Sequence, residues 1–575
     1  MDSKIPIIEF ADFGFKYKVQ NAPTLYNINL TLYAGEKVLI LGASGSGKST
    51  LANCINGIVP FSYKGTISGS LKVNGKETSD LSIFELSKHV GTVLQDSDAQ
   101  FVGLSVGEDI AFAMENDNIP RVEMLPTVLE NSKKVGMEDF LVALPFNLSG
   151  GQKQKVALGG VLGEEMNILI FDEPLASLDP KAGTAAIDLI DRIANVKDRT
   201  VIIIEHRLED VLYRPVDRII VMDEGRIVAD TTPLELLCST TLAQYGIREP
   251  LYVTALKYAG CKLENIKQLD DIENIELDDE QMAKLYAFFK SATDEIRPKP
   301  KEEVIRLSDI TYAYEQESNP RNVLRNISFS IKKGERVALI GKNGAGKSTV
   351  ARLICGISRP KTGAIYIGGD DYKKLSIKEI GENIGFVMQN PNQMLVKDTI
   401  KAEVELALQI RKMSDEEISA QSEKAMRTCE IYRMRNWPVD AVSYGQKKRV
   451  TIAAILALEP EVLILDEPTA GQDYRHYMEI ITFINKLNTE FGKTIIFITH
   501  DMHLAIENTD RAIVLADGEL VADSNVFSVL SNNDIIEKAN LKQTSLYTLA
   551  RKLDIPPEKF IEHYIRYERM VRVNE

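Results

Sequence analysis

The chain has 575 residues, of which 44% are hydrophobic and 26% charged, with a formal net charge of -15 at pH 7 and a pI near 5.2. This length exceeds the roughly 250–300 residues that one core supports, so it predicts at least two domains, and the ordinary apolar fraction excludes disorder throughout. The acidic balance disfavours a nucleic-acid surface, and apolar runs such as residues 201–204 fall far short of the roughly 18 residues of a membrane-spanning helix. The N-terminus lacks a secretory signal and the five scattered cysteines indicate neither disulfides nor a zinc site, so we expect a cytosolic chain.

The sequence contains two copies of one pattern. The glycine-rich segment that ends at Lys48 recurs at Lys347, an offset of 299 residues, and four later landmarks recur at a constant offset of 294. Both copies end in an apolar segment divided by a glycine, residues 218–230 and 511–523, which predicts two strands around a turn. A duplication of this length predicts two domains of one fold. The four later landmarks are Gln95 and Gln389, Ser149 and Ser443, Glu173 and Glu467, and His206 and His500.

An aromatic alternation begins each copy. It reads Phe15-Lys-Tyr17 in the first copy and Tyr312-Ala-Tyr314 in the second. A β-ribbon at this position can present a ring to an adenine, so Tyr17 and Tyr314 are candidate stacking residues. Buried strand aromatics are the alternative interpretation.

A glycine-rich loop follows the aromatic pair. Residues 37–41 and 336–340 are strand-like apolar runs, and each leads into G-x-x-x-x-G-K-S and then a helical pattern, which is the context that a phosphate-binding loop requires. Glycines let successive N–H groups point at phosphates, and the next helix N-terminus adds positive potential. The lysine is expected to reach the β- and γ-phosphates, and the serine after it to hold Mg²⁺. The predicted loop residues are Gly42, Ala43, Ser44, Gly45, Ser46, Gly47, Lys48, Ser49 and Thr50, and Gly341, Lys342, Asn343, Gly344, Ala345, Gly346, Lys347, Ser348 and Thr349.

Two adjacent carboxylates end a later apolar strand pattern in each copy. Asp172 and Asp466 are placed to support the Mg²⁺ shell, and the next residue, Glu173 or Glu467, to orient and deprotonate the attacking water. An acidic pair that merely starts a turn is the alternative, which a preceding phosphate loop disfavours.

A histidine ends a further apolar strand pattern in each copy, at His206 and His500. A single such histidine would more often be structural. Because both occur at the same offset as the glutamates, we predict contacts with the γ-phosphate, and we include Lys48 and Lys347 with the glutamates and histidines as catalytic residues.

A short signature lies between loop and carboxylates. It reads Leu148-Ser-Gly-Gly-Gln and Val442-Ser-Tyr-Gly-Gln, and with the glutamine landmarks and the turns at 177–179 and 471–473 it resembles the motif set of ATP-binding-cassette ATPases over nearly all of both copies. The resemblance implies ATP and Mg²⁺ as cofactors and ATP hydrolysis coupled to transport. It adds, as nucleotide-binding residues, Gln95, Ser149, Gly150, Gly151, Gln152, Gln389, Ser443, Gly445 and Gln446, with Gln95 and Gln389 also at Mg²⁺.

In that family two cassettes enclose two ATP molecules head to tail. By analogy, the loop of Lys48 faces the signature of Ser443, and the loop of Lys347 faces that of Ser149. Tyr444 replaces the first glycine of the second signature, so we expect an altered backbone there and a slower site. Two hydrolytic sites are still expected, because both copies keep the loop, the glutamate and the histidine.

The predicted fold is therefore α/β, with two tandem P-loop cassettes that each combine a mixed-sheet core with a helical subdomain. The first nucleotide-binding domain is expected at residues 1–232 and the second at 304–524. Residues 233–303 read as an acidic connector with some helix, and residues 525–575 as a small helical appendage interrupted by two prolines.

The segments that begin at the two glutamines, residues 95–112 and 389–399, bear a narrower resemblance to energy-coupling-factor importers. It implies an ATPase that drives uptake of a vitamin or metal ion through separate membrane subunits. The implied partners are an integral-membrane scaffold (T-type) subunit and a small membrane capture subunit, with no nucleic acid. The implied location is peripheral, at the cytoplasmic face of the cell membrane.

Two other classes are kept as alternatives. One is the tandem ATPase of a sugar-type importer, where one half usually has a damaged site, whereas neither half is damaged here. The other is a ribosome-associated translation factor, whose connector is basic and helical, whereas residues 261–303 hold 12 acidic and 7 basic side chains.

Overall fold

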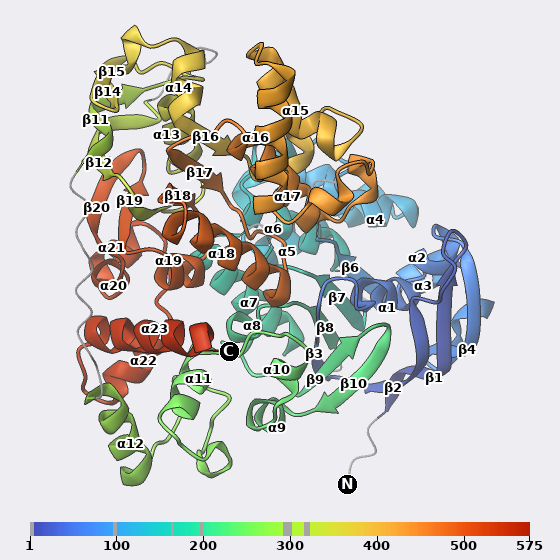
Figure 1. The fold of residues 1–575 in the computed structure, drawn as a ribbon. Coiled ribbons are helices and arrows are strands. Elements are labelled where there is room, and N and C mark those ends of the chain that lie inside the picture. Colours follow the sequence, from blue (N-terminus) through green and yellow to red (C-terminus); the bar gives the residue numbers. More distant parts are fainter. Residues whose placement is uncertain are drawn as a thin grey trace. The chain divides into compact units, whose positions relative to one another are not determined.

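The computed structural model describes two compact units, and each contains one copy of the sequence repeat (Figure 1). The first comprises Met1–Leu285 with Asp473–Arg475, and the second Tyr286–Gln472 with His476–Glu575. The described residues are 5–95, 100–162, 166–176, 178–195, 199–290, 302–314 and 322–574.

The first unit contains two sheets. The six-stranded sheet has the order β10-β9-β3-β8-β7-β6, with all neighbours parallel except β9 and β10. The four-stranded sheet, β2-β1-β4-β5, is antiparallel and lies at one side of this unit in Figure 1. Strands β3 and β8 are buried at every residue, as their unbroken apolar sequences predict for central parallel strands. The strands are β1 Pro6–Tyr17, β2 Leu25–Tyr33, β3 Lys37–Gly42, β4 Gly65–Val73, β5 Lys76–Glu77, β6 Val90–Val93, β7 Ile168–Asp172, β8 Thr200–Ile204, β9 Arg218–Asp223 and β10 Arg226–Thr231.

Helices α4, α5 and α6 pack together as a helical subdomain of the first unit, and α6 begins at the signature. The mixed sheet and the helical subdomain confirm the predicted fold. The helices are α1 Lys48–Ile55, α2 Ile58–Phe61, α3 Ile83–Ser87, α4 Val106–Asn116, α5 Arg121–Val135, α6 Gly150–Val161, α7 Pro180–Ala194, α8 Leu208–Val211, α9 Pro233–Cys238, α10 Thr241–Gln244, α11 Leu251–Tyr258 and α12 Asp279–Lys290, the last of which continues into the second unit.

The second unit repeats this architecture. Its sheets have the orders β16-β17-β18-β13-β19-β20 and β12-β11-β14-β15, and only β19 and β20 are antiparallel in the larger sheet. The predicted strand pairs around a glycine turn are β9 with β10 and β19 with β20, which confirms that interpretation. The strands are β11 Glu303–Tyr312, β12 Leu324–Lys332, β13 Arg336–Ile340, β14 Thr362–Ile367, β15 Asp370–Asp371, β16 Ile384–Val387, β17 Val462–Asp466, β18 Thr494–Ile498, β19 Arg511–Ala516 and β20 Glu519–Asn525.

Helices α15, α16 and α17 form the subdomain of the second unit. Throughout the described part of the chain, no helix combines the length and the apolar character that crossing a bilayer requires. The helices are α13 Lys347–Ile354, α14 Ile377–Asn383, α15 Ile400–Ile410, α16 Asp415–Thr428, α17 Tyr444–Leu456, α18 Tyr474–Thr489, α19 Met502–Asn508, α20 Val526–Leu530, α21 Asn533–Lys538, α22 Ser545–Lys552 and α23 Pro557–Asn574.

The segments outside the repeat are helical, as predicted. The acidic connector supplies α9 to α12, and its residues 291–301 lie outside the described part. In the C-terminal appendage, Leu546, Leu549 and Leu553 are buried at 0%, 0% and 1% exposure, so the apolar spacing marks a packed face. Pro557 begins α23, a position where its missing N–H costs nothing.

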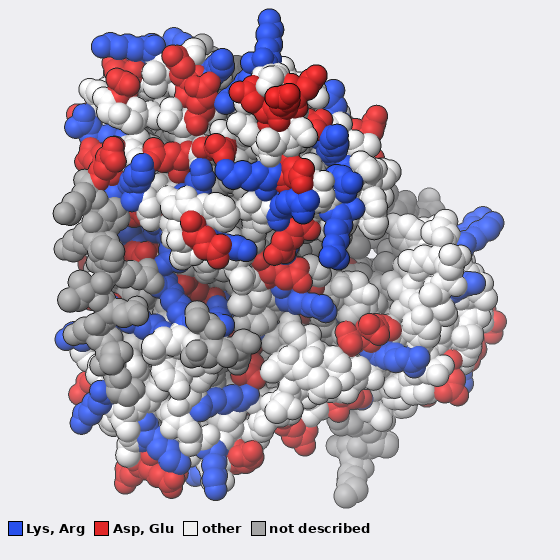
Figure 2. Space-filling view, in the orientation of Figure 1, with Lys and Arg blue, Asp and Glu red and all other residues white. Residues whose placement is uncertain are grey.

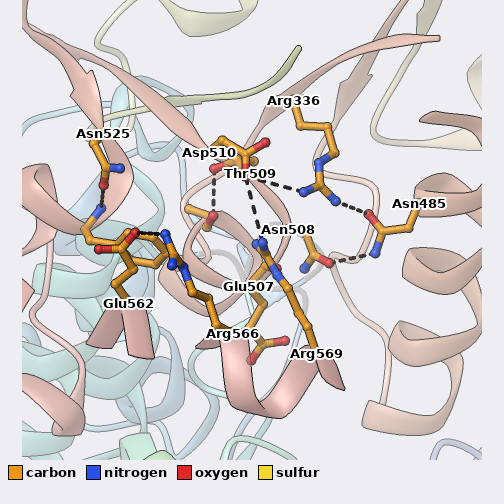
Figure 3. Close-up of polar contacts among 12 residues, drawn as sticks. Arg336, Asn485, Glu507, Asn508, Thr509, Asp510, Asn525, Glu562, Arg566 and Arg569 are labelled. Carbon is orange, nitrogen blue, oxygen red and sulfur yellow. Dashed lines mark hydrogen bonds and ion pairs between the residues drawn. The ribbon is translucent and has the colours of Figure 1, made fainter. Parts of the chain in front are cut away.

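Arginines of α23 hydrogen-bond to the end of α19 (Figure 3). Arg569 donates from Nε and Nη2 to the carbonyl oxygen of Glu507, at 2.9 and 2.6 Å, and an Arg572 nitrogen lies 3.4 Å from the Glu507 carboxylate. Asp510 lies 3.4 Å from Arg336 and 3.8 Å from Arg569. Because Glu507 is at the C-terminal end of α19, the guanidinium also offsets the negative end of the helix. The appendage therefore holds the helix that follows His500.

We expect Arg569→Met to loosen the end of α19, because a buried carbonyl loses a charge-assisted donor worth about 1.5–3 kcal/mol. Hydrogen–deuterium exchange of peptides that contain α19 should accelerate by about tenfold or more. Arg551→Met, on the exposed side of α22, is the matched control and should leave this exchange unchanged. Equal exchange in both variants would show that the arginine contact does not stabilise α19.

Candidate functional site

The two glycine-rich loops fold alike. Lys48 donates from Nζ to the carbonyls of the first two residues of its loop, both at 2.8 Å, and Lys347 does the same at 2.8 and 3.0 Å. Gly47 and Gly346 precede helices α1 and α13 with φ of 101°, a conformation that favours glycine. Each loop thus curls around its lysine at a helix N-terminus, the arrangement in which backbone amides bind phosphate.

The predicted adenine-stacking tyrosines are attached to these loops. The Tyr17 hydroxyl lies 3.1 Å from Oγ1 of Thr50, and the Tyr314 hydroxyl lies 3.0 Å from Oγ1 of Thr349. Each ring also packs edge-on against the preceding aromatic, with centroids 4.8 and 5.1 Å apart. The structure therefore brings both rings beside the phosphate loops, and adenine stacking stays a prediction.

The predicted Mg²⁺ ligands meet in pairs. Ser49 donates to Asp172 at 3.2 Å and Ser348 donates to Asp466 at 3.1 Å. A hydroxyl and a carboxylate are hard oxygen ligands, which suit Mg²⁺. Burial raises the pKa of Asp172, and burial together with the neighbouring Glu467 raises the pKa of Asp466 to about 6. A divalent cation at either pair would favour the charged carboxylate, so the residues fit the predicted metal.

Both candidate bases sit in a strained backbone conformation. The φ angle is 48° at Glu173 and 46° at Glu467, in the left-handed region, which costs a residue with a side chain about 1 kcal/mol or more. Each backbone N–H donates to the last carbonyl of the next strand, Ile204 at 2.9 Å or Ile498 at 2.8 Å. The sequence motif carried no signal of this conformation.

The two glutamates have different side-chain partners. Gln95 donates to Glu173 at 2.6 Å, whereas His206 Nδ1 lies 3.9 Å away. In the second unit, His500 Nδ1 lies 2.6 Å from Glu467. Burial, followed by the nearby Glu205 carboxylate, raises the pKa of Glu173 to about 7. Burial lowers the pKa of His206.

The signature serines start helices. Ser149 and Ser443 each cap a helix through a reciprocal pair of bonds, with Gln152 at 2.9 and 3.4 Å and with Gln446 at 3.0 and 3.3 Å. The glycines of the signature, Gly150, Gly151 and Gly445, lie in the first turns of α6 and α17. The predicted turn residue Ser177 lies outside the described residues.

The expectation that Tyr444 distorts the second signature is wrong. Tyr444 is the first residue of α17 and has no positive φ, so it needs no conformation reserved for glycine. Its hydroxyl instead donates to the carbonyl of Gln389 at 3.2 Å. The tyrosine therefore ties the second signature helix to the glutamine segment of the same unit.

A further link was not predicted from the motifs. Lys448, on α17, donates to the carbonyls of Glu467 and Pro468 at 3.0 and 2.6 Å, and Gln154, on α6, donates to that of Pro174 at 2.7 Å. Burial lowers the pKa of Lys448 to about 8. Gln154 and Lys448 are related by the repeat offset of 294, which is the signal that could have found them. In each unit the signature helix thus holds the turn that carries the base.

Buried carboxylates also hold the segments after the glutamines. Asp109 accepts from the amides of residues 102 and 103 at 2.9 and 3.0 Å, and Glu403 accepts from those of 396 and 397 at 2.8 and 2.7 Å. The first segment also bonds to residues 141–143, and the second to residues 435–439. Both regions present large apolar side chains to solvent. The exposed ones are Val102, Leu104, Val142, Leu144 and Phe146 in the first unit, and Val396 and Trp437 in the second.

Comparison with protein families places both copies in one family. The ABC transporter model matches residues 25–176 and 324–470, and a model described as an ATP-binding cassette cobalt transporter matches residues 239–312. A solved cassette, CbiO1 from Clostridium perfringens, described as part of the ABC transporter complex cbiONQ, is 32% identical and covers 44% of this chain and 100% of its own, with a TM-score of 0.39.

Curated relatives extend over the whole chain. A protein from Clostridium perfringens, provisionally named an ABC transporter ATP-binding protein, is 52% identical over 98% of this chain and 99% of its own length. Relatives with the same provisional name from Vibrio vulnificus and Enterococcus faecalis are 49% and 50% identical, each over 99% of this chain and over 98% and 100% of their own lengths. The chain therefore belongs to the ABC transporter ATP-binding proteins, and its two cassettes are an ATPase that hydrolyses ATP to drive transport.

Proposed function

We propose that this protein is the energy-coupling subunit of an importer of the energy-coupling-factor type, which takes up a vitamin or a metal ion. The observation that carries the proposal is the match of residues 239–312, which include most of the connector and β11 of the second cassette, to a model described for cobalt transporters. The match of both cassettes to the ABC transporter model supports membrane subunits as partners. We assign it to the cytoplasmic face of the membrane, with a scaffold subunit and a small capture subunit as partners.

Both sites are proposed to hydrolyse ATP, in nucleotide-binding domains at residues 1–232 and 304–524. Glu173 and Glu467 act as general bases, and His206 and His500 contact the γ-phosphate. Bound Mg²⁺ supplies positive charge next to the transferred phosphoryl group. The residues that hold it are Ser49, Asp172 and Gln95, and Ser348, Asp466 and Gln389.

The exposed apolar side chains after Gln95 support a docking role. Val102, Leu104, Val142, Leu144 and Phe146 have exposed fractions of 62%, 77%, 91%, 52% and 76%, on two segments that hydrogen-bond to each other. Such clustering on one surface is typical of a protein–protein contact. Helices of a membrane scaffold fit this surface, which lies on the same segment as a predicted Mg²⁺ ligand.

The alternatives are less well supported. Neither site lacks a predicted motif residue, which disfavours a sugar-type ATPase with one damaged half. On the face drawn in Figure 2, lysines and arginines are interspersed with acidic side chains. That distribution differs from the basic stripe by which proteins bind ribosomal RNA.

Loss of the two bases tests the catalytic assignment. Because general-base catalysis contributes about 10²–10⁴-fold, the Glu173→Gln, Glu467→Gln double variant should lose at least about 99% of its steady-state ATPase. Each single variant should also fall clearly below the wild-type rate in a coupled ADP-release assay. An unchanged rate in Glu467→Gln, with none left in Glu173→Gln, would contradict the two-site assignment.

Copurification tests the transporter assignment. The tagged double variant, which we expect to bind ATP without hydrolysing it, is extracted from native membranes in mild detergent with ATP and Mg²⁺, and bound proteins are identified by mass spectrometry. A multi-helix scaffold and one or more small membrane proteins should be recovered. Recovery of ribosomes without a membrane subunit would overturn the transporter proposal and leave the ATPase assignment intact.

A charge in the apolar surface should weaken this complex. We expect Leu104→Asp to reduce scaffold recovery by about tenfold or more, because an aspartate would be buried without a partner in the contact. Val19→Asp, at a side chain that is 94% exposed and lies far away in the sequence, is the control and should not change recovery. If the two variants recover equal scaffold, residue 104 is outside the docking surface.

A further inference from the structure

The two active sites differ at one position that no motif covers. The residue before the histidine is Glu205 in the first cassette and Thr499 in the second, at the repeat offset of 294. Glu205 and Thr499 are both 0% exposed. A fully buried carboxylate is expensive unless donors surround it, so Glu205 needs a structural or functional explanation.

The Glu205 carboxylate contacts His206 directly. It accepts from the backbone N–H of His206 at 3.1 Å and from that of Leu175 at 3.3 Å, and it lies 3.3 Å from His206 Nδ1. His206 Nδ1 is consequently 3.9 Å from the base, and Glu173 is bonded to Gln95 at 2.6 Å instead.

In the second cassette the base, Glu467, makes the corresponding contacts with the histidine, His500. The carboxylate of Glu467 accepts from the backbone N–H of His500 at 3.0 Å and lies 2.6 Å from its Nδ1. Thr499, too short to reach the histidine in this way, donates from Oγ1 to the other carboxylate oxygen of Glu467 at 3.2 Å. Both oxygens of the second base are thus engaged by the histidine strand.

The backbone cannot explain this difference, because it is the same in both cassettes. The bases have φ of 48° and 46°, and their amides bond to the neighbouring strand at 2.9 and 2.8 Å. The exchange of Glu205 for Thr499 accounts for which carboxylate each histidine meets.

We propose that Glu205 is a positioning residue, which holds His206 in place of the base, so that Glu173 pairs with Gln95 and not with the histidine, whereas in the second site Glu467 must first leave His500 before it can bind the attacking water. This inference rests on the proposed roles of Glu173 and Glu467. It makes the two sites unequal: the first is poised for hydrolysis, and the second is held until its histidine turns away.

Reciprocal exchange separates this role from a merely structural one. In nucleotide-free crystals, Glu205→Thr should bring His206 Nδ1 from 3.9 Å to about 2.6 Å from Glu173, as in the second site, and Thr499→Glu should draw His500 away from Glu467. Unmoved histidines in both structures would overturn the proposal without reference to any activity.

Single-site kinetics give the second readout. With only the first site active, in the Glu467→Gln background, Glu205→Thr should lower kcat by about tenfold with KM for ATP within about twofold, because the base is misplaced but ATP contacts remain. With only the second site active, in the Glu173→Gln background, Thr499→Glu should raise kcat, by roughly threefold or more. A structural role predicts losses in both exchanges, which would refute the inference.

Two controls keep the test decisive. Glu205→Gln retains one oxygen, which can still accept from the His206 amide next to Nδ1, and loses the acceptor for the Leu175 amide, so it should recover part of the kcat lost in Glu205→Thr. A Gln variant as impaired as the Thr variant, with histidine positions unchanged in the crystals, would refute the positioning role. Activity that persists in the Glu173→Gln, Glu467→Gln variant would instead refute the proposed bases themselves, a failure that the exchange variants do not produce.

Discussion

The active sites depend on one backbone hydrogen bond in each cassette. The amide of Glu173 or Glu467 donates to the last carbonyl of the neighbouring strand, which holds the proposed catalytic glutamate at a positive φ directly beside the strand that precedes the histidine. This bond joins two strand ends into one edge, where a carboxylate, a histidine and the serine–aspartate pair proposed for Mg²⁺ lie beside the phosphate loop. The strain in the glutamate backbone is tolerated because parallel strands buried on both faces fix the ends on either side.

The parts that lie outside the cassettes attach to this same edge. The helix after each histidine is hydrogen-bonded to a segment outside the cassettes. In the first unit, Glu209 of α8 accepts from the amide of Leu251, at the start of α11, at 2.9 Å. In the second unit, Arg569 and Arg572 contact Glu507 of α19. The connector and the C-terminal appendage are unrelated in sequence, yet each binds the element next to a γ-phosphate histidine candidate. The appended segments therefore contact each cassette next to the histidine strand.

Much of this arrangement could be predicted from the sequence, and the limits have a physical origin. The phosphate loops, the carboxylate pairs and the capping serines are local: each is encoded within a few residues and needs only a strand before it and a helix after it. Lys448 and Tyr444 bind residues far away in the chain, and Glu205 binds the adjacent His206 but matters because Glu173, on another strand, lies near the same histidine. The roles of all three therefore depend on packing that no short pattern specifies. The error at Tyr444 has the same source, since a missing glycine suggested strain, whereas the helical backbone accepts a side chain and gives its hydroxyl a partner.

The proposed difference between the two sites therefore lies at residues 205 and 499, and not at Tyr444, the substitution that suggested a slower site from the sequence. Tyr444 adds a contact between the second signature helix and Gln389. Both serine caps remain, as do the hydrogen bonds from Gln154 and Lys448 to the carbonyls after the strand, so the two signatures stay comparable. The exchange of Glu205 for Thr499 alters the partner of the base, where a shift of about 1 Å is enough to change a rate strongly. Two sites with complete motifs can thus differ through one buried carboxylate. A motif specifies which residues are present, whereas the neighbouring hydrogen bonds decide which residue each base contacts.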